Sequence, residues 1–118
     1  MQKTVLIVDD HPSFRGSARA ILEADGFEVV GEADSAEAAV AAARSLHPDV
    51  VLLDVQLPDR SGFDVCAELL RLNGAAPRVV LVSSRDACDY GELIASCGAC
   101  GFVPKAELSG DVITGLVG

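Results

Sequence analysis

The sequence predicts an α/β fold in which a parallel, five-stranded sheet is doubly wound, with helices on both of its faces. Two observations predict this fold. Apolar segments alternate five times with segments of helical periodicity along 118 residues, a length that suits one domain. The three strongest apolar segments also lack an in–out alternation, which indicates strands buried on both faces. Short connections and right-handed crossovers then lead to an open sheet covered by helices.

Five apolar segments are expected to form the strands. Three of them are apolar almost throughout, and the second and fifth in chain order are weaker. They are Val5–Val8, Phe27–Gly31, Val50–Leu53, Val79–Val82 and Gly101–Val103. Five strands of this kind suit the flavodoxin-like order 2-1-3-4-5, although the pattern alone does not fix the order.

The first two helices carry start and stop signals. Pro12 suits the first turn of the first helix, and Gly26 suits its end. Ser35 can cap the second helix, and Pro48 follows its end. The apolar face of the first helix is formed by Phe14, Ala18, Ile21 and Leu22, and that of the second by Ala36, Ala39, Val40 and Ala43.

The remaining three helices are less regular. Ser61 can cap a third helix that Asn73-Gly74 stops, and a weakly patterned fourth helix is expected around residues 87–97. A fifth helix is expected at about residues 107–117. The apolar positions of the third helix are Phe63, Cys66, Leu69 and Leu70, and those of the fifth are Leu108, Val112, Ile113 and Leu116.

The composition limits the classes of function. Half of the residues are hydrophobic, but the aromatic residues are only four Phe and one Tyr, so the core should be aliphatic. The formal net charge of −9 argues against nucleic-acid binding by this domain, and it fits a cation site, a basic partner or simple solubility. The first apolar run is too short for a signal peptide, and no run approaches the ~20 apolar residues of a membrane span, so a cytoplasmic protein is expected.

Polar side chains stand where four of the predicted strands end. Asp9 and Asp10 follow the first strand, Asp54 ends the third, Ser83 the fourth and Lys105 the fifth. In the order 2-1-3-4-5 the first and third strands are neighbours, so the three carboxylates should converge beyond the carboxyl ends of the strands. Clustered carboxylates repel one another, and a hard cation with oxygen ligands, such as Mg²⁺, removes that repulsion. Taken alone, Asp9-Asp10 is equally compatible with a cap of the following helix.

The four cysteines are expected to be free thiols. Cys97 and Cys100 have the C-x-x-C spacing, but a zinc or redox site would need a second pair, or a position at the start of a helix after a strand. Cys66 and Cys88 form no such pair, and free thiols are the usual state of cysteine in a reducing cytosol.

Four segments of the chain match the pattern of one known family. They read VLIVDDHPSFR, DVVLLDVQLPDRSGFDV, VVLVSS and GFVPK. In this order and spacing they resemble a response-regulator receiver domain, the phosphoacceptor part of two-component signalling, over nearly the whole chain. The stretches DDHPSFR and GFVPKAEL are most similar to the subfamily whose receivers precede a helix-turn-helix DNA-binding domain. The resemblance implies that residues 1–118 form a single receiver domain, and it favours a longer regulator with its output domain outside this chain over a stand-alone receiver.

The resemblance implies a phosphoacceptor and a metal site. Asp54 would accept a phosphoryl group from a phosphohistidine on a sensor histidine kinase or a phosphotransfer protein, forming an acyl phosphate. Mg²⁺ would be held by Asp54, directly by Asp10, through a water by Asp9, and by the backbone carbonyl of Gln56. The side chains of Gln56 and Arg85 stand where the family tunes dephosphorylation.

The resemblance also implies a switch. Lys105 and the Ser83 hydroxyl would bind phosphoryl oxygens, and Phe102 would be the aromatic switch residue. Ser83 replaces a frequent Thr and keeps the hydroxyl, whereas Phe102 replaces a frequent Tyr and lacks one. Many members have Pro after the Lys; here Pro104 precedes Lys105, so the geometry of the Lys105–Ala106 bond is left open. A phosphorylation-dependent homodimer that controls transcription is one expected response.

Other classes of function explain less of the chain. A haloacid-dehalogenase-like phosphatase also uses an Asp nucleophile and Mg²⁺, but it needs an acid two residues later, where this chain has Gln56. A flavin carrier of similar fold needs a phosphate-binding loop after the first strand, where DDHPSFR places negative charge. A phosphorylation-independent scaffold is a further alternative, although none of the acidic residues that phosphorylation needs is missing from the chain. We therefore expect a signalling switch that assists its own phosphorylation and dephosphorylation, and not a turnover enzyme.

Overall fold

Five parallel strands form one sheet in the order β2-β1-β3-β4-β5, which confirms the predicted topology. The structure is a computed structural model that describes residues 3–72, 76–84 and 90–117. The strands are β1 (Thr4–Val8), β2 (Glu28–Ala33), β3 (Val50–Asp54), β4 (Arg78–Ser83) and β5 (Gly101–Pro104). Four of the predicted apolar runs lie wholly within a strand. The second predicted run, Phe27–Gly31, begins one residue before β2, because Phe27 packs in the core but precedes the strand.

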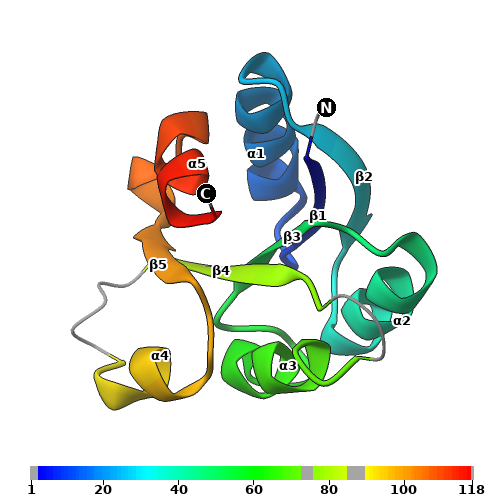
Figure 1. The fold of residues 1–118 in the computed structure, drawn as a ribbon, viewed down its shortest axis with the longest axis vertical. Helices are drawn as coiled ribbons and strands as arrows, with labels where there is room; N and C mark the ends of the chain where they lie inside the picture. Colours follow the sequence, from blue (N-terminus) through cyan, green and yellow to red (C-terminus); the bar gives the residue numbers. More distant parts are fainter. Residues whose placement is uncertain (1–2, 73–75, 85–89, 118) are drawn as a thin grey trace.

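Helices cover both faces of the sheet, as predicted. They are α1 (Pro12–Ala24), α2 (Ala36–Leu46), α3 (Gly62–Leu69), α4 (Glu92–Ser96) and α5 (Gly110–Val117), with a 3₁₀ turn, η2 (Lys105–Glu107), before α5. Figure 1 shows α1 and α5 on one side of the sheet and α2, α3 and α4 on the other. None of the helices within the described ranges is long and apolar enough to cross a membrane.

Successive strand residues alternate between two aliphatic cores. The core under α1 and α5 contains Val5, Ile7, Leu52, Val80, Val82 and Val103. The core under α2 and α3 contains Leu6, Val8, Val51, Leu53, Val79 and Leu81. By the same alternation, Asp9 and Asp54 lie on the face of the sheet under α1 and α5, whereas Ser83 and Phe102 lie on the face under α2 and α3. The polar strand-end residues are therefore divided between the two faces of the sheet.

The register of the sheet aligns the strand ends. Val8 lies opposite Leu53, Asp54 opposite Val82, and Ser83 opposite Pro104. Because all strands are parallel, the residues that follow these pairs emerge at one edge of the sheet. The residues expected at the functional site are brought to that edge by the backbone alone.

Side chains cap both helices that follow β2 and β3. Ser35 and Ser61 each accept a hydrogen bond from a backbone N–H in the first turn of α2 and α3, respectively, which confirms the predicted caps. Asp59, in the loop between β3 and α3, also caps α2 by accepting hydrogen bonds from the N–H groups of Ala36 at 2.8 Å and Glu37 at 3.1 Å. The hydrogen bond from Ala36 holds the pKa of Asp59 below its ordinary value. The loop after β3 is thus tied to the start of α2.

The predicted start of the last helix at residue 107 is wrong. The chain first forms η2, and α5 begins only at Gly110, because the Ser109 hydroxyl accepts a hydrogen bond from the N–H of Val112 at 3.2 Å and caps the helix. Val112, expected on the apolar face, is 39% exposed, while Ile113 is buried.

Some sequence predictions fall outside the described residues. They concern the stop signal Asn73-Gly74, the side chains of Arg85 and Cys88, and the first residues of the predicted fourth helix. Within the described part, that helix is α4, five residues long.

A hydrogen bond between the end of α1 and the start of α5 allows the packing of these two helices to be tested. Asp25 Oδ2, just after α1, accepts a hydrogen bond of 3.0 Å from the N–H of Gly110, the first residue of α5. Asp25→Ala should lower the free energy of unfolding by about 1 kcal/mol, because it leaves this N–H without its acceptor. Asp25→Asn keeps an acceptor oxygen and should recover most of the loss. Urea unfolding of both variants measures the effect, and equal stability of Asp25→Ala and the wild type would contradict it.

Candidate functional site

Three carboxylates gather beyond the ends of β1 and β3. Asp9 is fully buried, Asp54 is 3% exposed, and Asp10 lies at the surface. Within the described part of the chain, Asp9, Asp10, His11 and Asp54 form a group whose ligand atoms all lie within 4.8 Å of one another. The side chain of His11 was not among the residues expected from the sequence.

Lys105 joins this cluster from the end of β5. Its Nζ lies 2.6 Å from Asp9 Oδ2 and 3.5 Å from Asp54 Oδ2, and the side chain is only 17% exposed. Lys105 Nζ also lies 4.6 Å from the centre of the Phe14 ring on α1, a cation–π arrangement. The sequence suggested Phe14 only as a core residue. The amine is therefore held between two carboxylates and an aromatic ring.

The ionisation of Asp54 is strongly perturbed. Burial raises the pKa of its carboxyl from an ordinary 3.8 to about 6, and the negative charge of Asp9 acts in the same direction. The hydrogen bond from the Gln56 N–H, at 3.1 Å, and the charge of Lys105 lower the pKa but do not cancel the effect of burial. Asp54 is thus a desolvated carboxylate whose charge is incompletely compensated.

Asp9 is held by contacts that the sequence did not reveal. Asp9 Oδ1 accepts a hydrogen bond from the backbone N–H of His11 at 2.8 Å and lies 3.0 Å from His11 Nδ1. Asp10 Oδ1 lies 3.1 Å from the same nitrogen. Arg15 on α1 donates a hydrogen bond to the backbone carbonyl of Asp9 at 2.6 Å. The stretch DDHPSFR therefore positions its own two carboxylates.

Ser83 and Phe102 lie on the other face of the sheet, in an aromatic group. Ser83 is 2% exposed, and its hydroxyl lies 2.8 Å from the hydroxyl of Tyr90. The Tyr90 ring packs on Phe63 and Phe102, with ring centres 5.5 and 5.7 Å apart. Tyr90 was missed because it falls in the weakly patterned region around the fourth helix.

The loop after β3 folds tightly back on Asp54. Gln56 and Ser61 form an antiparallel bridge, and the N–H of Gly62 donates a hydrogen bond of 2.7 Å to the carbonyl of Val55. The Gln56 side chain is exposed. Lys105–Ala106, whose geometry the sequence left open, is a trans bond, since the described residues contain no cis peptide bond. Arg85, which with Gln56 was expected to tune dephosphorylation, lies outside the described residues.

The three cysteines that the structure describes are not part of the carboxylate cluster. Cys66, Cys97 and Cys100 are free thiols, and the thiol of Cys66 donates a hydrogen bond of 3.4 Å to the carbonyl of Cys97. Burial, reinforced by the neighbouring Cys97, raises the pKa of Cys66 to about 12, so this thiol is protonated at neutral pH.

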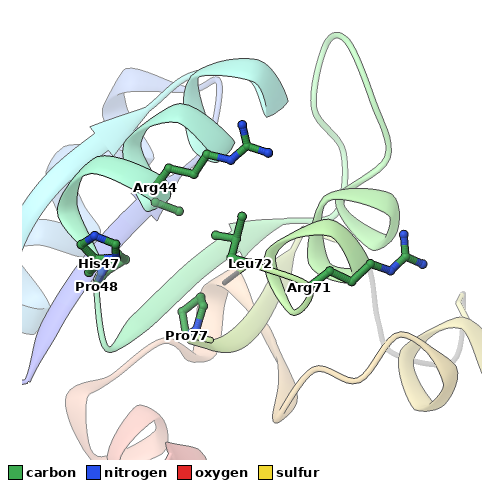
Figure 2. Close-up of a pocket in the computed structure, with 7 residues that line it drawn as sticks. Arg44, His47, Pro48, Arg71, Leu72 and Pro77 are labelled. Carbon is green, nitrogen blue, oxygen red and sulfur yellow. The ribbon is translucent and has the colours of Figure 1, made fainter. Parts of the chain in front are cut away.

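A cavity of about 300 Å³ lies at the opposite, amino-terminal ends of β3 and β4. Its walls include Arg44, His47, Arg71 and Leu72, and none of the strand-end residues. Figure 2 shows that the guanidinium groups of Arg44 and Arg71 do not converge on a common point. The cavity therefore lacks the charge arrangement of the carboxylate cluster.

The chemistry of the carboxylate cluster fits a hard divalent cation. Asp9, Asp10 and Asp54 offer oxygen atoms, the ligands that Mg²⁺ prefers. The raised pKa of Asp54 shows that the repulsion and desolvation of these groups are incompletely relieved by Lys105. The residues present therefore fit Mg²⁺.

Comparisons with known proteins agree with this arrangement. The family model of the response regulator receiver domain matches residues 5–115. The response regulator GacA of Pseudomonas viridiflava is 39% identical over 102 residues, which cover 86% of this chain and 47% of GacA. BvgA of Bordetella pertussis, named as a positive transcription regulator of virulence factors, is 37% identical over 113 residues, which cover 96% of this chain and 54% of BvgA.

A solved structure is also similar over the whole length. The signal receiver domain of the response regulator NarL from Mycobacterium tuberculosis has a TM-score of 0.85 and 33% identity, covering 99% of this chain and 98% of that one. By contrast, the chain spans about half the length of GacA and BvgA. From the matched residues and these relatives, the chain belongs to the receiver-domain family of two-component response regulators.

Proposed function

We propose that Asp54 is the phosphoacceptor of this receiver and that a histidine kinase or a phosphotransfer protein is its phosphoryl donor. The observation that carries the proposal is the position of Lys105, whose amine lies between the carboxylates of Asp9 and Asp54 at the carboxyl end of the sheet. An amine held there is placed to pair with a phosphoryl oxygen on Asp54. The buried position of Asp54 keeps water from competing for its carboxylate.

The acid cluster would hold Mg²⁺ in this function. The ligands would be Asp9, Asp10, Asp54 and the backbone carbonyl of Gln56, with Asp9 acting through a water. When bound, the ion supplies positive charge that offsets the negative charge of the phosphoryl oxygens.

The transfer itself needs little covalent assistance. An oxygen of the Asp54 carboxylate forms the new bond to phosphorus, and the bond between phosphorus and the donor imidazole nitrogen breaks. The electron pair of that bond stays on the imidazole, which leaves as a neutral histidine after taking up a proton. Lys105 pairs with one phosphoryl oxygen, and the Ser83 hydroxyl donates a hydrogen bond to another.

The phosphorylated carboxylate then acts as a switch. Phosphorylation adds charge and acceptor oxygens at the end of β3, close to Ser83 on the neighbouring strand. Movement of Ser83 would open space for Phe102, and the surface formed by α4, β5 and α5 would change. The phosphoryl group shifts this equilibrium only through contacts that differ between the two states.

We infer further that the output of the whole protein is transcription. GacA and BvgA are regulators about twice the length of this chain, and BvgA is named as a transcription regulator. A helix-turn-helix segment in the coding sequence that continues this chain would support the inference. An enzymatic segment there would contradict it.

Incubation with Mg²⁺ and acetyl phosphate tests the phosphoacceptor directly. Intact mass spectrometry should show one phosphate adduct on the wild type and none on Asp54→Asn, because the amide cannot accept the group. Asp34→Asn is the matched control, since Asp34 also follows a strand but is exposed and outside the cluster. An adduct that persists in Asp54→Asn would refute the assignment.

A further inference from the structure

Tyr90 connects the functional site to an aromatic group. It is the single tyrosine of the chain, and it lies just before α4. Its hydroxyl is 2.8 Å from that of Ser83, and either oxygen can be the donor. Its ring packs edge-on against Phe63 and at a tilt against Phe102. One side chain therefore touches both residues that the proposed switch would move.

We propose that Tyr90 is a positioning residue that holds the Ser83 hydroxyl in the unphosphorylated state and releases it when Asp54 carries a phosphoryl group. This inference rests on the proposed function. Phe102 lacks the hydroxyl that is frequent at its position, and the phenol of Tyr90 supplies a polar contact to Ser83 from a different segment of the chain.

The two faces of the sheet explain why the contact must break. Ser83 lies on the face that packs under α2 and α3, whereas Asp54 lies on the face that packs under α1 and α5. The Ser83 hydroxyl now points to Tyr90, on its own face of the sheet. To reach a phosphoryl oxygen at the end of β3, it would have to rotate toward the other face of the sheet, away from Tyr90. The hydrogen bond to Tyr90 therefore competes with the hydrogen bond to the phosphoryl group.

The structure has space beside Tyr90 into which its ring can move. An open cleft of about 520 Å³ lies between Tyr90 and the loop after β3, and its walls include Leu57, Pro58 and Phe63. Gln56, Asp59, Arg60 and Ser61 line most of the rest of the cleft, so a ring that moves into it keeps its apolar contacts along the side formed by Leu57, Pro58 and Phe63. Because α4 begins two residues after Tyr90, such a movement would reach the surface of α4.

Removal of the Tyr90 hydroxyl tests the competition. Tyr90→Phe keeps the ring but abolishes the hydrogen bond to Ser83, so the rotation of the Ser83 hydroxyl toward the phosphoryl group no longer has to break this contact. The rate of adduct formation with acetyl phosphate and Mg²⁺ should rise about threefold to tenfold, the range expected for the loss of one net hydrogen bond. The matched control is Thr4→Val, which removes the hydroxyl that Asp49 contacts at the other end of the sheet, and it should leave the rate unchanged.

Tyrosine emission reports on the release directly. The chain has one tyrosine and no tryptophan, so all intrinsic emission above that of phenylalanine comes from Tyr90. Beryllofluoride with Mg²⁺, a mimic of the phosphoryl group, should change this emission in the wild type and leave it unchanged in Asp54→Asn. Ser83→Ala should show the changed emission without beryllofluoride. If Tyr90 were purely structural, the wild type would give the same emission with and without beryllofluoride.

The outcomes separate the two proposals. If the wild type forms no adduct, the proposed function fails and the role of Tyr90 falls with it. If the wild type forms the adduct but Tyr90→Phe reacts at the wild-type rate or more slowly, the competition is refuted while the phosphoacceptor assignment stands.

Discussion

Replacing Asp54 by asparagine should raise the free energy of unfolding of the metal-free protein at neutral pH by about 1–3 kcal/mol. The reason is the buried charge. Burial and the charge of Asp9 raise the pKa of Asp54 from 3.8 to about 6, so the folded protein binds a proton at this position more tightly than the unfolded chain. At neutral pH the carboxyl is ionised in both states, and the folded state carries the whole cost of desolvation. Asparagine removes the charge and that cost.

The sign of the pH dependence follows from the raised pKa. The stability contributed by protonated Asp54 is fully present below the unfolded-state pKa of 3.8 and is lost as the pH rises through about 6. The wild type should therefore lose stability relative to Asp54→Asn across this window, and the difference should be constant above it. Urea unfolding of both proteins in a chelator, at a series of pH values, measures the difference.

Mg²⁺ should make the wild type more stable than Asp54→Asn. The ion binds the folded carboxylates and not the unfolded chain, so it stabilises the wild type by mass action and has less effect on Asp54→Asn. A wild type that is as stable as Asp54→Asn in the chelator at neutral pH, and that does not respond to Mg²⁺, would contradict both the raised pKa and the metal site.

Gly62→Ala should lower the free energy of unfolding by about 2–4 kcal/mol. A Cβ at residue 62 would overlap the backbone carbonyl oxygen of Asp54 and lie 2.7 Å from the Cα of Val55. Both are backbone atoms, so no rotamer change relieves the overlap. The loop from Asp54 to Gly62, which positions the Gln56 carbonyl, would have to shift, and we expect phosphorylation of Asp54 to slow as well.

Gly16→Ala is the matched control for this substitution. Gly16 lies inside α1, where an added Cβ meets no atom within 4 Å, so alanine should stabilise the helix by about 0.5–1 kcal/mol. Thermal unfolding compares the two variants. A Gly62→Ala protein as stable as the wild type would show that the loop has room that the structure does not provide.

The sequence predicted the features that arise from local patterns. Buried strands without alternation, a Ser before each of two helices, and acids at strand ends are all visible in short windows of sequence. Together with the parallel strand order they lead to the position of the carboxylate cluster. The predicted start of α5 was wrong because Ser109, and not a residue nearer to β5, caps the helix. The pattern of apolar residues does not distinguish between these possible caps.

The missed residues act through contacts between distant segments. Phe14 lies against Lys105, and Asp59 caps the start of α2, which lies more than twenty residues earlier in the chain. Tyr90 meets Ser83 through a contact between their hydroxyl groups, seven positions apart in the chain. No window of sequence shows these pairs, since each depends on the completed fold.

Under the proposed function, the division of the strand-end residues between two sides of one sheet places the phosphoacceptor apart from the aromatic group that responds to it. Asp9, Asp54 and Lys105 lie together on the side of α1, while Ser83, Tyr90 and Phe102 lie on the side of α3 and α4. Substitutions on the surface of α4, which belongs to the second side but touches none of the three carboxylates, would then be expected to alter which partner senses the modification while Asp54 goes on accepting it.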